Sequence, residues 1–251
     1  QGSFVEIGGA VTARNTDFNL QTKETPSDGV ITGYGVIDGN LVYVYSQDAT
    51  VLKGAIGEMH AKKIANIYDM AMKMGAPVIG LVDCAGLRLQ EATDALEAFG
   101  SLYHKQAMAS GVVPQISVVL SDCLGTSAIT ASSADFVIKA KDAKISVQTS
   151  DDEGCNCSVA IIADDKEDAI SKDKDLILYM PSNNLSTAPC AEEFGPDSEG
   201  KCIVCKTLDA GSDVKLYDHI GETAKVGFAR LQGEVVGVVQ TKGGKIQKPD
   251  G

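Results

Sequence analysis

Tryptophan is absent from this 251-residue chain, and aromatic residues make up only 5% of it. Long apolar runs are also missing, since none approaches the roughly 20 consecutive residues that a membrane-spanning helix needs. The sequence does not begin with the basic and then apolar segment of a secretory leader, so we expect no membrane segment and no secretion. The remaining composition, 44% hydrophobic residues with 26 glycines, predicts a core packed from aliphatic and small side chains.

Positive charge is scarce in this chain. It has 22 Lys and Arg residues against 34 Asp and Glu residues, which gives a formal net charge of −12. Nucleic acids and anionic membranes are bound through clustered Lys and Arg, so this balance argues against both. The seven cysteines are odd in number and dispersed, which does not suit a disulfide framework. We therefore expect a protein of the reducing cytoplasm.

Strands and helices alternate through the first part of the chain. The hydrophobic periodicity predicts strands at 29–37, 41–46, 78–82, 115–120, 135–139 and 144–147 and helices at 56–74, 91–109 and 125–133. This alternation predicts an α/β fold whose mostly parallel sheet is covered by helices. The composition then changes, so we expect a core at 1–150, an acidic helix and polar connecting arm at 151–222, and a hairpin at 223–251.

The hairpin near the C-terminus repeats an earlier one. VGFARLQGEVVGVVQ, which begins at Val226, aligns with ITGYGVIDGNLVYVYSQ, which begins at Ile31. Both have a Gly-aromatic pair, a two-residue turn and a Val-rich return strand. The chain thus holds one β-β-α-β unit and the opening hairpin of another. Either a second domain has been cut off, or this hairpin completes a sheet of the first domain or of a partner.

Two apolar strands end in turns of small residues. In VIGLVDCAGLRLQE (78–91) the apolar run stops, and Cys84, Ala85 and Gly86 turn the chain toward a helix. The same layout recurs in SDCLGTS (121–127). Backbone amides at such turns lack partners and suit a developing negative oxygen. Two such turns facing one cleft would form a single anion-stabilising site.

Ordered motifs run through nearly all of residues 1–250. They are GSFVEIG at 2–8, TDF at 16–18, DGVITGYGVIDG at 28–39, VLKGAIGEMHAKKI at 51–64, GAPVIGLVDCAGLRLQE at 75–91, ASGVVPQISVVLSDCLGTSA at 109–128 and MPSNNLSTAP at 180–189. Together they resemble the carboxyltransferase components of biotin-dependent acyl-CoA carboxylases and decarboxylases, members of the crotonase-like superfamily. So many matches at consistent spacing are far more specific than a lone glycine motif.

The resemblance implies a crotonase-like (ClpP/crotonase) ββα superhelix. It also implies a carboxyltransferase component that moves a carboxyl group between biotin, held on a biotin carboxyl carrier protein, and a short-chain acyl-CoA. In this family a first-type domain holds the coenzyme A thioester and a second-type domain holds the biotin arm, usually across subunits. This chain resembles the first-type half with the opening hairpin of the second. A second-type carboxyltransferase subunit is therefore an implied partner, in a homo- or hetero-oligomer.

The resemblance also places the catalytic donors. The first turn of the family, Asp-Ser-Gly-Gly-Ala-Arg, sets its two glycines at Ala85 and Gly86, and the second, Gly-Pro-Cys-Ala-Gly-Gly, corresponds to residues 121–126. We expect the amides of four residues to stabilise developing charge without a nucleophilic side chain. These residues are Ala85, Gly86, Gly125 and Thr126.

Four positions depart from the family pattern. Ala85 and Thr126 stand where the family has glycine, and Leu87 and Leu124 stand where it has smaller residues. Ala85 is tolerated there only if its φ angle is negative. The added bulk narrows the pocket, shifts substrate choice or marks a subunit that no longer catalyses.

The loop after the second strand is expected to line the coenzyme A cleft. The cofactor-binding candidates are Gln47, Asp48, Thr50, Lys53, Gly54 and, beyond the loop, Arg88. An ordinary polar loop would carry the same residue types. Lys53, with Lys62 and Lys63 of the next helix, could meet phosphates, although outward lysines on an amphipathic helix are usually only solvated. Arg88 either forms an internal ion pair or caps the turn, or it contacts a phosphate.

We expect no metal site among the cysteine and histidine residues. The later chain carries two cysteine pairs, Cys155 with Cys157 and Cys202 with Cys205. Four thiolates could bind zinc, but C-x-C is an unusual half-site and the pairs are far apart, so free thiols are favoured. Cys84 and Cys123, beside the turns, are expected to be buried packing residues. His60 and His104 lack suitably spaced partners and are expected to be structural.

Two other functions stay open. A stand-alone crotonase-like acyl-CoA hydratase or thioesterase would need a general base in the cleft, for which Glu91 is the candidate. A non-catalytic assembly subunit would keep the fold, and the altered turn residues favour it. The sequence leaves open which acyl group is used and whether it is carboxylated or decarboxylated.

Overall fold

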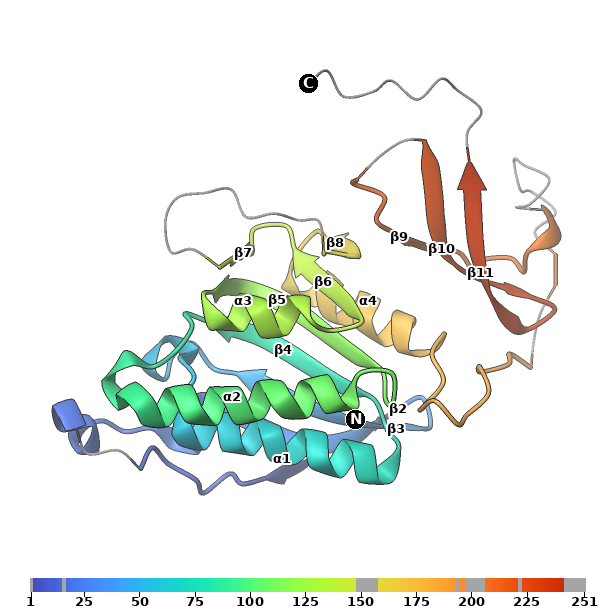
Figure 1. Cartoon of the computed structure of the whole chain (residues 1–251). Coiled ribbons are helices and arrows are strands. Elements are labelled where there is room, and N and C mark those ends of the chain that lie inside the picture. Colours follow the sequence, from blue (N-terminus) through green and yellow to red (C-terminus); the bar gives the residue numbers. More distant parts are fainter. Residues whose placement is uncertain are drawn as a thin grey trace, which may run out of the picture. The chain divides into compact units, whose positions relative to one another are not determined.

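The computed structural model (Figure 1) describes residues 2–14, 17–147, 158–192, 195–196, 206–220 and 223–241. The chain forms two compact units. Unit 1 falls within residues 1–174 and 182–186, and unit 2 falls within residues 175–181 and 187–251. Across the described ranges, no helix has both the length and the apolar character needed to cross a membrane.

Unit 1 is built on a mixed sheet of eight strands. They are β1 (Val5–Ile7), β2 (Val30–Ile37), β3 (Asn40–Gln47), β4 (Val78–Cys84), β5 (Gln115–Leu124), β6 (Phe136–Ala140), β7 (Lys144–Ser146) and β8 (Ile161–Ala163). Their order is β1-β2-β3-β4-β5-β6-β8, and β7 pairs with β5. The pairs β1–β2 and β2–β3 are antiparallel, and the others are parallel. The predicted α/β fold with a mostly parallel sheet is confirmed.

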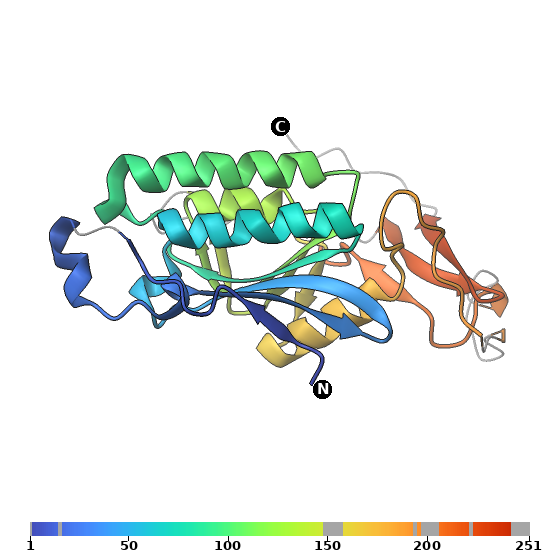
Figure 2. The same cartoon turned by 90° about the horizontal axis from the view of Figure 1, so that it is seen from below.

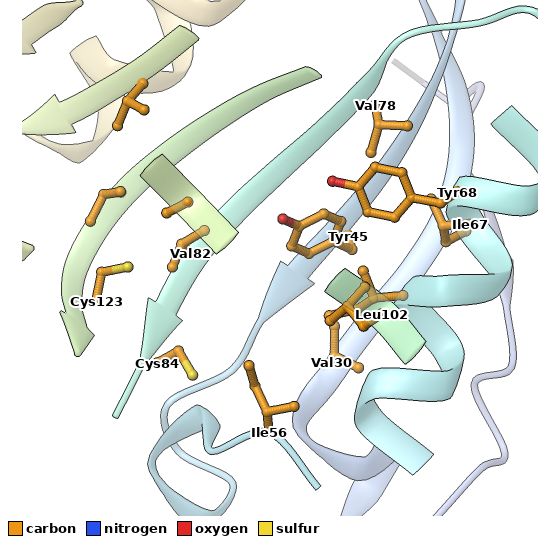
Figure 3. Close-up of a cluster of buried hydrophobic side chains, with 14 of the residues drawn as sticks. Val30, Tyr45, Ile56, Ile67, Tyr68, Val78, Val82, Cys84, Leu102 and Cys123 are labelled. Atoms are coloured by element: carbon orange, nitrogen blue, oxygen red, sulfur yellow. The ribbon is translucent and has the colours of Figure 1, made fainter. Parts of the chain in front are cut away.

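Helices cover this sheet. They are α1 (Glu58–Met74), α2 (Ala92–Ala109), α3 (Thr126–Ser132) and α4 (Lys166–Ile177), with the 3-10 turns η1 (Asp17–Thr22), η2 (Pro26–Gly29), η3 (Leu52–Gly54) and η4 (Leu89–Glu91). Figure 2 shows α1, α2 and α3 together on one face of the sheet. In the core beneath them, the rings of Tyr45 in β3 and Tyr68 in α1 lie 6.5 Å apart (Figure 3). Aliphatic and small side chains make up most of the remaining core, as the composition predicted.

Two strand ends differ from the prediction in a way that shapes the site. β4 continues to Cys84 and β5 to Leu124, past the ends predicted at residues 82 and 120. The register between the two strands shifts after Val82, so that Cys84 pairs with Cys123. The polar end of β5 remains extended because β7 pairs with it as well. The two strands therefore finish next to each other.

Lys63 corrects the expectation that both adjacent lysines of α1 point outward. Its side chain is buried, and Nζ donates to the carbonyl oxygens of Ser27, at 2.9 Å, and Val30. Burial lowers the pKa of Lys63. Lys62 is exposed, as predicted, and pairs with Glu58 at 2.6 Å. Lys63 therefore ties the N-terminal segment to α1 and does not face a ligand.

A segment distant in sequence completes the end of α1. Asn183 Nδ2 donates to Gly75 O at 2.8 Å, and Asn184 N donates to Val112 O at 2.9 Å. Gly75 is the left-handed C-cap of α1, with φ 64°, and a Cβ atom there would lie 2.7 Å from Asn183 Nδ2. The paired residues Gly75 and Asn183 are 108 positions apart. The motif MPSNNLSTAP thus supplies part of unit 1.

Unit 2 contains a three-stranded antiparallel sheet. Its strands are β9 (Val214–Leu216), β10 (Ala224–Leu231) and β11 (Glu234–Thr241), in the order β11-β10-β9. In unit 1, β1 pairs with β2 as Val5↔Tyr34, Glu6↔Gly33 and Ile7↔Thr32. In unit 2, β9 pairs with β10 as Val214↔Phe228, Lys215↔Gly227 and Leu216↔Val226. The sequence repeat is therefore a repeat of structure with the same register.

The same glycine contact occurs in both sheets. A Cβ atom on Gly33 would collide with Val5 O, and a Cβ atom on Gly227 would collide with Val214 O. Each glycine lets its neighbouring short strand cross close to the hairpin. The repeat thus extends from the hairpin to the strand beside it, which the sequence alignment did not include.

Candidate active site at the ends of two parallel strands

The two predicted turns lie side by side where β4 and β5 end. Cys84 pairs with Cys123, and both side chains are buried on neighbouring strands (Figure 3). Beyond them, Ser127 Oγ lies 2.8 Å from Leu124 O and 3.3 Å from Cys84 O. This hydroxyl bridges the turns, which converge as predicted.

Gly86 of the first turn lies close to Leu124 of the second. Its φ angle is 103°, which disfavours any residue with a side chain, and a Cβ atom there would lie 3.0 Å from Leu124 O. Its amide nitrogen lies 3.3 Å from Cys84 Sγ, which is only a weak acceptor. The Gly86 amide is thus held in place without a strong hydrogen bond, as a donor to a negative oxygen should be.

Two of the four amides expected to be donors are already engaged. Ala85 N donates to Lys53 O at 3.1 Å, and Gly125 N donates to Ser146 O at 2.8 Å. Thr126 begins α3, where the first amides have no acceptor within the helix, and its Oγ1 is buried with no partner among the described residues. Of the four amides, those of Ala85 and Gly125 are therefore engaged with backbone carbonyls, whereas that of Gly86 bonds only to a sulfur and that of Thr126 lies at the start of α3.

The loop between β3 and α1 packs against the first turn. Gly54 has φ 62°, and a Cβ atom there would collide with Asp83 O. Ile56 N donates to Gly86 O at 2.8 Å, and Arg88 N donates to Ile56 O at 2.9 Å. These two hydrogen bonds pair the loop with the first turn in the pattern of a short parallel bridge between Ile56 and Leu87.

Residues 1–151, more than half of the chain, match the family model described as the carboxyl transferase domain. The chain belongs to this carboxyl transferase family. The methylmalonyl-CoA decarboxylase subunit alpha of Propionigenium modestum is 35% identical to it over 279 residues, covering 95% of this chain and 54% of the relative. The propionyl-CoA carboxylase beta chain of Roseobacter denitrificans is 35% identical over 278 residues, with the same two coverages.

Solved structures agree with this assignment. Transcarboxylase 12S, a hexamer solved with methylmalonyl-CoA bound, matches this carboxyl transferase domain with a TM-score of 0.86 and 27% identity, over 96% of this chain and 54% of that one. The family resemblance and the crotonase-like fold predicted from the sequence are confirmed. The chain spans about half the length of the curated relatives it matches.

The residues predicted to bind coenzyme A differ in accessibility. Asp48 Oδ1 accepts from Thr50 Oγ1 at 2.6 Å on the loop, and Lys53 is exposed nearby. Gln47, in contrast, is buried, with Nε2 3.1 Å from His60 Nε2 and with Oε1 lacking a partner in the part of the chain that the structure describes. The three loop residues can reach a ligand, whereas Gln47 supports the loop from the core.

Arg88 lies inside the carboxyl transferase core, with 1% of its side chain exposed. Nη1 donates to Asp28 Oδ1 at 2.6 Å and to Glu91 Oε1 at 2.7 Å, and Nη2 donates to Ala55 O at 2.9 Å. Its interpretation as an internal ion pair is confirmed, and a guanidinium so enclosed does not present itself to a phosphate. Glu91 is also buried and accepts from Glu58 N at 2.6 Å, so it is not an accessible general base.

Burial disfavours the reactive thiolate form of both cysteines beside the turns. Burial raises the pKa of the Cys84 thiol and raises that of Cys123 to about 12, so both stay protonated near neutral pH. The four cysteines considered for zinc, Cys155, Cys157, Cys202 and Cys205, lie outside the described residues. Within the described ranges, no group of three or more His, Cys, Asp or Glu side chains is arranged to hold a metal ion.

Proposed function

We propose that this domain is the acyl-CoA side of a carboxyltransferase that moves a carboxyl group between carrier-bound biotin and a short-chain acyl-CoA. The observation that carries the proposal is the convergence of the two turns, where the amides of Gly86 and Thr126 remain as donors. Methylmalonyl-CoA and propionyl-CoA, named for two relatives, support an acyl group of three or four carbons.

The donor set fits this chemistry. Adding or removing a carboxyl group beside a thioester places negative charge on the thioester oxygen, and fixed amide donors stabilise that charge. Losing one such donor typically raises the activation barrier by about 2.7–4 kcal/mol. Biotin, when bound, carries the carboxyl group and needs hydrogen-bond donors at its ureido oxygen rather than a covalent partner. The turns supply donors and no reactive thiol, so they suit both oxygens.

Three residues of the loop, Asp48, Thr50 and Lys53, are proposed to hold coenzyme A. Asp48 and Thr50 are bonded to each other in the loop that flanks the first turn, and Lys53 directly precedes the glycine packed against that turn. Lys53 is exposed and brings a positive charge to an acidic chain, as binding a phosphate requires. Gln47 and Gly54 then act by shaping the loop.

The partner we propose is a second-type carboxyltransferase half. In unit 1, residues 43–46 of β3 pair in parallel with β4. The matching residues of β11, 237–240, lie at the edge of the sheet that unit 2 forms among its described residues. Val239 takes the place of Tyr45 and is 73% exposed, whereas Tyr45 is 6% exposed. A strand and helix of the second half would cover this edge as β4 and α1 cover β3.

Two further parts of the proposal do not depend on the geometry of the turns. A biotin carboxyl carrier protein is the second proposed partner, since biotin must reach the turns on a mobile arm. Location in the cytoplasm also stays a prediction, based on the dispersed cysteines.

Carboxyl exchange in the complex with the second half tests the function. We expect Gly86→Ala to slow exchange by about 10²–10³-fold, because a Cβ atom at φ 103° and 3.0 Å from Leu124 O displaces the amide. Gly100→Ala in α2 is the matched control, since nothing lies within 4 Å of its added Cβ atom. Equal rates in the two variants would remove the turn from the site, and no exchange by the wild-type complex would overturn the function.

One observation favours a non-catalytic assembly subunit as the alternative. The amides of Ala85 and Gly125, which the resemblance assigned to catalysis, are engaged with backbone carbonyls. Calorimetric titration with acetyl-CoA, with and without the second half, separates the two functions. No binding at millimolar acetyl-CoA would support the assembly subunit, and binding accompanied by exchange would support the enzyme.

A further inference from the structure

The N-terminus of α1 is capped by residues distant in sequence. Its N-cap is Gly57, which has no side chain for this purpose. Glu58 N instead donates to Glu91 Oε2 at 2.6 Å, and His60 N donates to Asp28 Oδ2 at 2.8 Å. Carboxylates are favoured at a helix N-terminus, where they satisfy amides that have no acceptor in the helix. These two are 3% and 0% exposed, so a buried cation is also needed to balance them.

Arg88 is that cation. Nη1 bridges Asp28 and Glu91 at 2.6 and 2.7 Å, and Nη2 reaches Ala55 O at 2.9 Å. A Cβ atom on Gly57 would collide with Nη1, so the guanidinium occupies the space that a capping side chain would fill. Burial raises the pKa of Asp28, and the charge of Arg88 opposes that rise. The two capping carboxylates and the guanidinium of Arg88 therefore form a single buried ion-pair network.

The neighbouring histidine does not compete as a cation. His60 Nδ1 lies 3.0 Å from Asp28 O, an acceptor, so Nδ1 carries the proton, and Nε2 then accepts from Gln47 Nε2 at 3.1 Å. Burial lowers the pKa of His60 to about 3, which leaves the ring uncharged at neutral pH. Lys63 adds a second positive charge near Asp28, but its Nζ donates to backbone carbonyls. Arg88 is thus the direct partner of both carboxylates.

The backbone of Arg88 belongs to the first turn. Its amide donates to Ile56 O at 2.9 Å, and Ile56 N donates to Gly86 O at 2.8 Å. The guanidinium is held at the start of α1, and this fixes the position of the Arg88 backbone, two residues after Gly86. One side chain therefore connects the helix, the loop and the turn.

We infer that Arg88 is a positioning residue, which fixes the Gly86 amide by locking the first turn to the N-terminus of α1 through Asp28 and Glu91. It touches no substrate. The inference rests on the proposed function, because the position of Gly86 affects a rate only if its amide stabilises a substrate oxygen. Lysine cannot replace Arg88, since an ammonium group lacks the planar fork that joins two carboxylates and a carbonyl.

Arg88→Lys in the carboxyltransferase complex tests the inference. We expect kcat for exchange to fall at least about tenfold, while KM for acyl-CoA changes less than about threefold, because a displaced donor affects the transition state more than binding. Arg14→Lys is the matched control: Arg14 also forms a bidentate pair, with Glu58, but its side chain is 68% exposed and does not contact the turn. This control should leave both constants within about twofold.

Hydrogen exchange on the chain alone gives a readout that needs no activity. Arg88→Lys should speed exchange of the Ile56 amide and of the residue 88 amide at least about tenfold, because these amides bond to Gly86 O and Ile56 O. Arg14→Lys should not change either rate. Faster exchange at residues 56 and 88 combined with no transfer by the wild-type complex would overturn the proposed function while supporting the link between Arg88 and the turn. Unchanged amides, or an unchanged kcat in a wild-type complex that transfers carboxyl groups, would overturn the positioning role.

A milder variant keeps the test valid if Arg88→Lys does not fold. Glu91→Gln retains an acceptor for Glu58 N and removes one of the two charges that hold Arg88. We expect a loss of about threefold in kcat with the same pattern of amide exchange. No change in either measurement would overturn the inference.

Discussion

The sheets β1-β2-β3 and β9-β10-β11 share one register, one glycine contact and one turn form, yet their surroundings differ. Each hairpin turns through two residues of positive φ, 45° and 85° at Asp38 and Gly39, and 53° and 85° at Gln232 and Gly233. β3 is paired with β4 and packed under α1, whereas β11 is an edge strand. The comparison teaches that local sequence determines the turn and the register, while burial depends on the elements that cover the sheet.

Removing the ring of Tyr45 should have the largest effect. Tyr45→Ala deletes a side chain that is 6% exposed and packed on Tyr68, so we expect unit 1 to lose about 3–5 kcal/mol of stability. Val239→Ala at the matching position of β11, 73% exposed, should change stability by less than about 0.5 kcal/mol. Urea unfolding curves measure both. Similar losses would show that the second sheet is as well packed as the first.

Lowering the pH should destabilise unit 1, which contains the first of the two sheets and His60, by the next largest amount. The pKa of His60 is lowered to about 3, chiefly by burial, from an ordinary value of 6.5. The unfolded chain therefore binds the proton more readily, and stability should fall by up to about 1.4 kcal/mol per pH unit as pH drops from 6.5 toward 3. The raised pKa of Asp28 acts in the opposite direction at the acid end of this range.

Unfolding measured at pH 7, 6, 5 and 4 tests this dependence on unit 1. The variant His60→Gln removes the titrating group and should flatten the slope between pH 6.5 and 5. A slope that persists unchanged in this variant would assign the acid sensitivity to other groups.

Adding a methyl group at the shared glycine should have the smallest effect of the three. Gly33→Ala forces a Cβ atom against Val5 O inside the large sheet, which should cost unit 1 about 1–3 kcal/mol. Gly227→Ala creates the same collision with Val214 O, but should only release β9. Amide exchange of β9, measured beside the unfolding of unit 1, separates a local from a global loss. A drop in the stability of unit 1 in Gly227→Ala would contradict this separation.

The longer elements were predictable because several periods of hydrophobic pattern define each one. The hairpin strands, α1 and α2 fall within two residues of their predicted ends. β1, β8 and β9, of three residues each, were not predicted, because so short a segment rarely shows a period; β7, equally short, was predicted. β5 extends beyond its apolar run because β7 pairs with its polar end, a contact that the composition of β5 does not indicate.

The convergence of the turns was also predictable, because the carboxyl ends of neighbouring parallel strands meet at one edge of a sheet. Which amides remain available was not, since Ala85 and Gly125 bond to carbonyls of other segments. An internal ion pair of Arg88 was predicted, but its distant partner Asp28 was not, for the same reason. Arg88 and Asp28 are 60 positions apart, and no local pattern marks two such residues as partners.

The Asn183 contact with Gly75 has a consequence for the order in which the protein is made. The last strand of the large sheet, β8, ends at Ala163, so all strands of that sheet are synthesised before Asn183. Until then, Gly75 O and Val112 O lack the donors that Asn183 and Asn184 provide. Co-translational folding of the first half therefore ends only when the MPSNNLSTAP segment has emerged, and a nascent chain stalled before residue 182 holds an unfinished α1 terminus.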